Sequence, residues 1–270
     1  MVRKTLHQRY ISFIGDGTVR HLFDALCRAL GDTTTDDTNG DSNSGGDGLS
    51  GDGDGDGTTM GSDRLEWYRY DDGSTIILQY CYAPLPGDIA TFLGEMRKRR
   101  SLDINNICGA DMIVAGCGML DTLHISSSID GGEEGVSSST KRAVEETYLC
   151  AVCNLATKFL LIQQPLQRPR QQQDGVLHSS ATSTIWMTPT TINTQALLNG
   201  GSIERRRYMD ERTVEKTRTL YRDLGIYDAV RFVLDGKMLT EDLIHESWDG
   251  VLYPKVVYDV GIQIVLNALD

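Results

Sequence analysis

The order of apolar and polar residues predicts a chain in which strands alternate with helices. A short apolar run at 10–14 is followed by a stretch, 18–30, in which apolar residues recur every three to four positions and so share one helical face. That face consists of Val19, Leu22, Phe23, Leu26 and Leu30. The same patterns predict strands at 64–70, 74–82, 111–120, 183–189 and 229–236, and helices at 87–100, 139–164, 203–223 and 254–269. Strands separated by helices favour a parallel sheet covered on both faces, so the expected fold is α/β, in a single domain over 1–270.

An acidic, glycine-rich segment at 31–63 interrupts this pattern. It contains nine Asp and no Lys or Arg, with almost no apolar residue to bury, which predicts a disordered insert within the domain. Its Asp and Gly residues match the ligand spacing of a calcium loop at Asp52, Asp54, Asp56, Gly57 and Asp63. An EF-hand needs a helix on both flanks of that loop, so simple Gly-Asp repetition is the favoured explanation.

The charge of the chain is concentrated in this insert. The formal net charge is −12, and the insert accounts for −9 of it, which leaves −3 for the rest of the chain. No basic stripe is present, so we expect no nucleic-acid partner. A hydrophobic fraction of 40% in 270 residues is enough to form a core without disulfides or metals.

The six cysteines lie in apolar segments, which favours buried thiols over a disulfide scaffold. Cys150 and Cys153 form a CxxC inside the predicted helix 139–164, but no second ligand pair accompanies them, so a structural role is favoured over a metal or redox site. No apolar run reaches the roughly 18 residues of a membrane span, and the first residues lack the apolar core of a signal peptide. We therefore expect either a cytosolic protein or a piece of a longer chain.

Three motifs lie in loops that follow predicted strands, where parallel sheets carry their chemistry. They are FIGDGTVRHLF at 13–23, VAGCGM at 114–119, and ESWDGVLYP at 246–254, the last followed by IVLN at 264–267. The first motif matches neither GxxxxGK[ST] nor GxGxxG, so it does not indicate a phosphate-binding loop.

Together the motifs resemble three blocks of the SGNH (GDSL-type) esterases. The first is similar to FxGDSxxRxLF, the form found in plant PC-esterase relatives and in the fungal capsule and animal sialate O-acetyltransferase family. The second resembles that family's G-x-G-x-W strand end, with Met119 in place of Trp, and the third resembles DGLHxP followed by LLN. The resemblance covers the chain outside the insert and implies an SGNH-hydrolase-like three-layer α/β/α fold.

The resemblance also implies a mechanism and its site. In that family a Ser attacks an acyl group, a His removes the Ser proton, and an Asp orients the His. In this sequence the nucleophile position is Gly17, the base position is Leu252, and Asp249 is retained. Glycine has no oxygen and leucine cannot accept a proton, so the resemblance implies an impaired active site. Backbone N–H groups near Gly17, Gly116 and Gly118 would form the oxyanion and substrate site.

Two substitutes for the missing groups remain open. Thr18 and His21 could form a nucleophile–base pair, although a first-turn role in the helix is favoured for Thr18. His245, four residues before Asp249, could reach the base position, although an ordinary loop histidine is favoured. Arg20 stands where the family has Arg, and a structural ion pair is favoured for it over binding of a substrate carboxylate.

Three hypotheses follow. In the first, the chain is a domain of a glycan O-acetyltransferase relative that has lost its serine chemistry. The resemblance then implies the Golgi lumen, a capsule or cell-wall glycan as partner, an acetyl donor such as acetyl-CoA, and a membrane half beyond residue 270, with no cofactor or metal in this chain. In the second, it is a non-catalytic glycan- or partner-binding pseudoenzyme. In the third, Gly17 and Leu252 are introduced changes or sequence errors in an active enzyme, which is disfavoured because two separate positions differ.

Overall fold

A six-stranded sheet forms the centre of the structure, a computed structural model that describes residues 6, 9–31, 63–69, 75–102, 110–119, 138–164, 182–200, 205 and 209–268. Its strands are β1 (Tyr10–Gly15), β2 (Arg64–Arg69), β3 (Thr75–Tyr82), β4 (Met112–Gly116), β5 (Ser183–Met187) and β6 (Phe232–Leu234). They lie in the order β2-β3-β1-β4-β5-β6. The first apolar run of the sequence, at 10–14, thus forms a central strand.

The sheet is parallel except at one edge. β1 pairs in parallel with β3 and β4, and β4, β5 and β6 continue in the same direction. β2 instead runs antiparallel to β3. Only five residues separate these two strands, whereas a parallel crossover needs a dozen or more, so the chain can return only as a hairpin.

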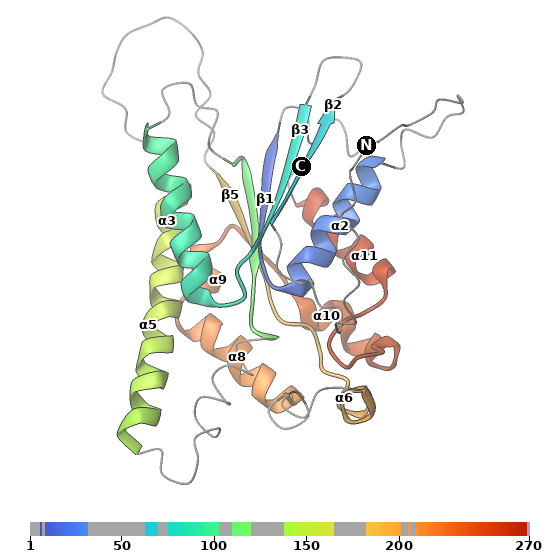
Figure 1. Ribbon diagram of the computed structural model, residues 1–270. Coiled ribbons are helices and arrows are strands. Elements are labelled where there is room, and N and C mark those ends of the chain that lie inside the picture. Colours follow the sequence, from blue (N-terminus) through green and yellow to red (C-terminus); the bar gives the residue numbers. More distant parts are fainter. Residues whose placement is uncertain are drawn as a thin grey trace, which may run out of the picture.

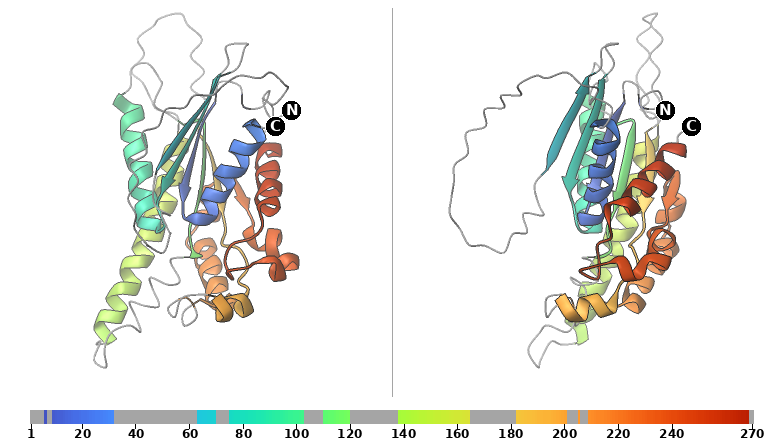
Figure 2. Two further views of the ribbon diagram at one scale, coloured as in Figure 1. Left: turned by 45° about the vertical axis from the view of Figure 1, so that its right-hand side comes forward. Right: turned by 90° about the vertical axis from the view of Figure 1, so that its right-hand side faces the viewer.

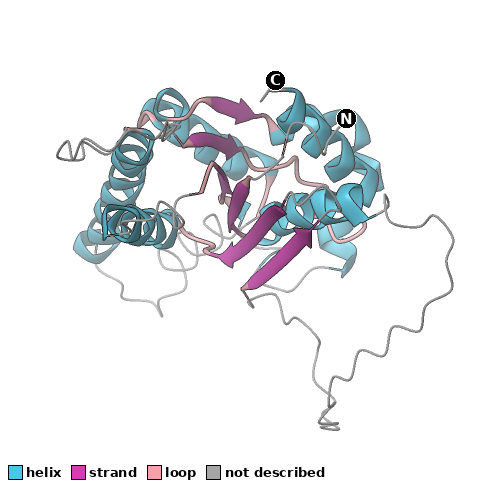
Figure 3. Ribbon diagram, turned by 90° about the horizontal axis from the view of Figure 1, so that it is seen from above, coloured by secondary structure: helices cyan, strands magenta, loops and turns pink. Residues whose placement is uncertain are grey.

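Helices cover both faces of the sheet, which confirms the predicted three-layer α/β/α arrangement (Figures 1 and 3). α2 (Gly17–Gly31) and α11 (Lys255–Asn267) pack side by side on one face, and α3 (Pro86–Leu102) and α5 (Ser138–Gln163) on the other. The second view of Figure 2 shows α2 and α11 in front of the sheet. The remaining helical elements are α6 (Thr194–Gly200), α8 (Glu211–Asp223), α9 (Ile226–Ala229), α10 (Gly236–Thr240) and the 3₁₀ helix η1 (Glu241–Glu246).

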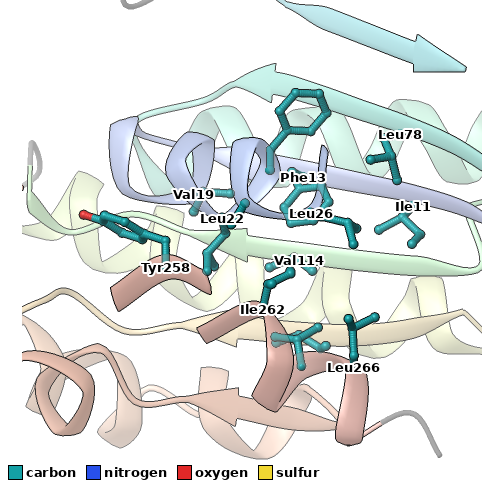
Figure 4. Close-up of a cluster of buried hydrophobic side chains, with 14 of the residues drawn as sticks. Ile11, Phe13, Val19, Leu22, Leu26, Leu78, Val114, Tyr258, Ile262 and Leu266 are labelled. Atoms are coloured by element: carbon teal, nitrogen blue, oxygen red, sulfur yellow. The ribbon is translucent and has the colours of Figure 1, made fainter. Parts of the chain in front are cut away.

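The apolar face predicted for the first helix is buried in full. Leu22, Phe23, Leu26 and Leu30 are all inaccessible to solvent, and Val19 is almost so. They pack between the sheet and the apolar side of α11, as Figure 4 shows. Each large apolar side chain buried in this way contributes about 1.5–3 kcal/mol relative to its exposed state, so this periodicity fixes how α2 docks on the sheet.

A second apolar cluster fills the space between the sheet and the helices α3 and α5. Trp186 of β5 lies at its centre, with the rings of Phe159 and Tyr221 edge-on to the indole at 5.9 and 5.2 Å. Such edge-to-face pairs add about 0.5–1.5 kcal/mol to the gain from burial. The sheet therefore has a packed core on each of its two faces.

The predicted helix at 203–223 differs from the observed one in its start and in its environment. α8 begins at Glu211, where the Asp210 side chain caps it by accepting the Thr213 N–H at 2.7 Å. Arg218 and Tyr221, in a segment expected to be solvated, are buried. One side of the helix instead packs against the rest of the protein. In the sequence, the few apolar residues of that side are interspersed with many charged residues.

The expectation that the cysteines are buried is wrong for the CxxC pair. Cys81 and Cys117 are buried and Cys27 is half-buried, but Cys150 and Cys153 are exposed on α5. Most of the acidic insert, including the calcium-like spacing from Asp52 to Gly57, lies outside the described residues, as does Cys108. In the described part of the chain no helix is long and apolar enough to cross a membrane.

Candidate active site

The site begins where the parallel strands β1 and β4 end side by side. Gly15 lies opposite Gly116 in the register of the two strands, and the Asp16 N–H donates to the Gly116 carbonyl at 3.4 Å. A Cβ atom at Gly15 would clash with that carbonyl oxygen and with Val19. Glycine is therefore required for the strand ends and α2 to approach each other this closely.

Asp16 joins the end of β1 to the start of α2. Its buried carboxylate accepts the Thr18 N–H at 2.9 Å, and it also receives hydrogen bonds from the Thr18 hydroxyl and from the backbone of Val19 and Met119. Burial raises the pKa of the Asp16 carboxyl, and these hydrogen bonds oppose the rise. The carboxylate thus caps the helix and ties it to the segment that follows β4.

Asp249 organises the loop that leads into α11. Its Oδ1 atom accepts the N–H groups of Val251 and Leu252 at 2.9 and 2.7 Å. Gly250, between Asp249 and Val251, has a φ of 87°, a left-handed conformation that favours glycine. This turn places the side chain of Leu252 on the same side of the loop as the carboxylate, facing a shared pocket.

The loop after β5 holds the Asp249 turn in place. Asn193 donates its backbone N–H to the Gly250 carbonyl at 2.9 Å and its side-chain amide to the Ser247 carbonyl at 3.1 Å. The Thr190 hydroxyl donates to the Val251 carbonyl at 3.2 Å. The two loops therefore form one hydrogen-bonded unit at the carboxyl edge of the sheet.

Arg218 of α8 anchors this unit from behind. Its side chain is 6% exposed, and it donates to the carbonyls of Pro189 and Thr190 at 3.0 and 2.7 Å. Its charge is balanced by Glu211 and Glu215, whose carboxylates lie at 2.6 and 2.8 Å. A planar guanidinium can make these several bonds at once, which an ammonium cannot.

These elements surround a pocket with about 380 Å³ of empty space, part of which is open to solvent. It is lined by Asp16, Gly17, Thr18, Met119, Arg205, Met209, Asp249, Val251 and Leu252. The structure thus brings together the three positions that the motifs assigned to nucleophile, base and orienting acid, although Gly17 lies more than 230 residues before Asp249 and Leu252.

The pocket holds neither a hydroxyl at the nucleophile position nor a nitrogen base at the base position. Gly17 is the first residue of α2, and its φ is not among the left-handed values found at Gly118, Gly225 and Gly250. A serine would therefore meet no backbone strain there. Leu252 is buried and lines the pocket, and its side chain contains only carbon and hydrogen.

The retained carboxylate has a cationic neighbour. The Asp249 side chain is 15% exposed, and its Oδ2 atom lies 3.8 Å from a guanidinium nitrogen of Arg205, which also lines the pocket. At this distance the pair is an ion pair without a well-formed hydrogen bond. In a catalytic triad, a protonated histidine places a positive charge beside the carboxylate. Here Arg205 places a positive charge beside Asp249.

The two proposed substitutes for the missing groups occupy different surroundings. Thr18 lines the pocket, but its hydroxyl bonds to the Asp16 carboxylate. The ring of His21 stacks on Tyr258 with centroids 4.9 Å apart, and burial lowers the pKa of this histidine. His245 is 71% exposed on η1, pairs with Glu246 at 3.3 Å, and is not part of the pocket lining.

The other predicted site residues lie around the pocket without lining it. Arg20 sits in the first turn of α2 with its guanidinium 6.0 Å from the centre of the Tyr80 ring. Gly116 ends β4 and Gly118 lies two residues beyond it; a Cβ atom at Gly116 would clash with the Met187 carbonyl, and one at Gly118 with Pro189. Both glycines are thus explained by packing, and the next residue, Met119, is the one that reaches the pocket.

Sequence reasoning did not name five of the lining residues as site residues: Arg205, Met209, Val251, Asp16 and Met119. The first two lie in the charged segment 203–223 that the sequence presents as a solvated helix, and no spacing there distinguishes them. Val251 lies inside the third motif, between two positions of the family pattern. In the described part of the chain no group of three His, Cys, Asp or Glu side chains is arranged to hold a metal ion.

The chain is similar, at low identity, to solved structures of an acetylxylan esterase. No protein-family model matches the chain, and no curated protein matches its sequence. An acetylxylan esterase from Geobacillus stearothermophilus is similar with a TM-score of 0.44 and 12% identity, over 97% of this chain and 94% of that chain, and a catalytic mutant of it gives the same values. A further mutant, described as an acetyl-xylooligosaccharide esterase, has a TM-score of 0.41 and 13% identity, over 96% and 91% of the two chains. At this identity the likeness concerns the path of the chain and not its activity.

Proposed function

We propose that this chain is an SGNH-type domain related to glycan O-acetyltransferases and acetylesterases, in which serine-based chemistry is disabled. One observation carries the proposal: Gly17, Asp249 and Leu252 line a single pocket at the carboxyl edge of the parallel sheet, and only the carboxylate can take part in acyl transfer. Loss of a triad member typically lowers kcat by about four to six orders of magnitude, and further losses within the triad add little.

The family resemblance extends the proposal beyond the site itself. It supports an O-acetylated glycan as the ligand, the Golgi lumen as the location, and an acetyl donor delivered by a membrane-embedded half. These parts rest on the sequence motifs at 13–23, 114–119 and 246–254 alone.

The test restores the missing groups one at a time. Hydrolysis of an acetyl ester is measured for the unaltered protein, for Gly17→Ser, and for Gly17→Ser combined with Leu252→His. We expect background rates for the first two and a rise of at least tenfold for the double variant, because the serine needs a base and Asp249 is in place to orient it. Adding Asp249→Asn to the double variant is the control, and it should remove most of the gain.

Activity of the unaltered protein well above background would overturn the proposal. Thr18→Val would then show whether the Thr18 hydroxyl is the nucleophile, since valine keeps the shape of threonine without its oxygen. A further substitution, His21→Gln, would show whether His21 is the base that serves the Thr18 hydroxyl, because glutamine cannot accept the proton.

A second candidate is a glycan-binding domain without any reaction. Trp248 favours it, because this indole is 72% exposed and its residue directly precedes Asp249, which lines the pocket. Titration with an O-acetylated oligosaccharide and with its deacetylated form, followed by tryptophan fluorescence, tests this candidate. Binding that is lost in Trp248→Ala, with no hydrolysis by any variant, would favour it over the disabled enzyme.

A further inference from the structure

The exposed thiols of α5 are the largest departure of the structure from the sequence-based expectations, and the proposed function does not use them. Cys150 and Cys153 are exposed residues of α5, and neither belongs to the cluster around Trp186. Val152, Leu155 and Phe159 make up the buried side of the same helix. Within the described residues neither thiol forms a hydrogen bond, an ion pair or a disulfide.

The spacing of the two cysteines sets what they can bind together. Both belong to a continuous helix, Ser138–Gln163, so residues three apart lie on one face with Cβ atoms about 5–6 Å apart. A disulfide needs Cβ atoms about 3.5–4.5 Å apart, so closing one here would distort the helix. Two sulfurs held by one metal ion, with bonds of about 2.3 Å, can lie up to about 4.6 Å from each other. The helix therefore suits a bridging ion better than a sulfur–sulfur bond.

The surroundings decide which ion fits. Glu146 lies one helical turn before Cys150 and pairs with Arg142 at 2.9 Å, and the described part of the chain supplies no third Cys, His, Asp or Glu to the two cysteines. Structural zinc requires four protein ligands, whereas thiolates select soft ions such as copper(I), for which two sulfur ligands can suffice. We propose that Cys150 and Cys153 form a two-thiolate site for a soft, thiophilic metal ion, with copper(I) as the representative.

Binding at this site is an acid–base exchange without a redox step. Two S–H groups lose their protons to solvent, and two metal–sulfur bonds form to an ion that keeps its oxidation state. The affinity should accordingly fall as pH decreases, because protons compete with the metal for the thiolates.

The site is tested by titrating the reduced protein with copper(I) under anaerobic conditions, in competition with a chromophoric copper(I) chelator. We expect one copper ion per chain to be bound by this pair, and a loss of at least tenfold in affinity for Cys150→Ser and for Cys153→Ser. Cys27→Ser is the matched control, since this half-buried thiol lies on the opposite face of the sheet, and it should leave the titration unchanged. Far-ultraviolet circular dichroism verifies that each variant is folded.

Two outcomes would overturn the proposal. One is a copper stoichiometry and affinity in the variant Cys150→Ser with Cys153→Ser that equal those of the unaltered protein. The other is a preference for zinc with one ion per two chains and a dimer in analytical ultracentrifugation, which would mean four thiolates from two copies.

Discussion

At the scale of single residues, Asp249 does the work of a structural cap as well as occupying a family catalytic position. Its Oδ1 atom accepts two backbone N–H groups, while its Oδ2 atom faces Arg205. The turn from Gly250 to Leu252 therefore depends on the Asp249 side chain, which gives this residue a structural role of its own.

The first prediction concerns this cap. Asp249→Ala leaves two N–H groups without their acceptor, and we expect a loss of about 1–2 kcal/mol in the free energy of unfolding, measured with urea. Asp249→Asn keeps an oxygen acceptor and is the control, which should lose less than half as much. Equal losses in both variants would contradict a role as a cap and point to the ion pair with Arg205.

A second residue-scale prediction concerns the buried Asp16. Burial raises the pKa of this carboxyl above its ordinary value of 3.8, so the folded state holds the proton over a range in which the unfolded state has released it. The Asp16 contribution to the free energy of unfolding therefore decreases as pH rises from about 3.8 through the raised pKa. In Asp16→Asn, which cannot ionise, this part of the pH dependence should disappear. The free energy of unfolding is measured for both proteins between pH 3.5 and 7. Plotted against pH, the two sets of values should converge or cross, and parallel plots would refute the effect.

How far the site could be predicted depends on the kind of signal each residue carries. The motifs identify Gly17, Asp249 and Leu252 because family patterns fix their order and spacing, and the structure places all three on one pocket. Arg205 and Met209 carry no such signal, because their position depends on how the chain between β5 and α8 folds back over the sheet edge.

At the scale of elements, periodicity succeeds where a helix has one clearly apolar side. The face of α2 is such a case, and its five predicted members are all buried. In α8 charged residues outnumber apolar ones, but the apolar positions share one side as clearly as in α2, and hydrophobicity fails only to reveal that Arg218 lies on that buried side. The short helices α6 and α10 are held by loop contacts and span too few turns for any period to appear.

The third prediction concerns how α8 is fixed to the loop after β5. In Arg218→Lys the bonds to the Pro189 and Thr190 carbonyls cannot be kept together with both carboxylates, and we expect a loss of about 2–4 kcal/mol in the free energy of unfolding. Arg222→Lys, on the same helix but exposed, is the control and should change stability by less than about 0.5 kcal/mol. Equal stability of the two variants would show that the buried guanidinium is not the anchor.

At the scale of the whole molecule, one sheet is shared by two cores. Leu26 belongs to the cluster under α2 and α11, and Phe159 to the cluster under α3 and α5. Because β1, β4 and β5 have side chains in both clusters, loss of either core should disrupt the sheet that supports the other.

The fourth prediction tests this coupling and the expectation of a single domain. Leu26→Ala and Phe159→Ala each remove a fully buried side chain, with expected losses of about 2–5 kcal/mol. In calorimetry each should lower the same single transition, by roughly 2–4 °C per kcal/mol. Leu160→Ala, beside Phe159 but exposed, is the control. Two separate transitions, each affected by one variant only, would show that the layers unfold independently.

The left-handed turn at Gly250 also bears on the thermodynamics of recognition. A Cβ atom there would clash with Leu197 and the Asn193 carbonyl. The turn at Gly250 is therefore closely packed, and its conformation is fixed before any ligand binds. A ligand that enters the pocket need not order it, which spares about 0.5–1.5 kcal/mol for each side chain that binding would otherwise freeze. Met119 and Met209, by contrast, are unbranched and can adjust their shape. One pocket thus combines a conformationally fixed turn on one side with adaptable methionines on the other.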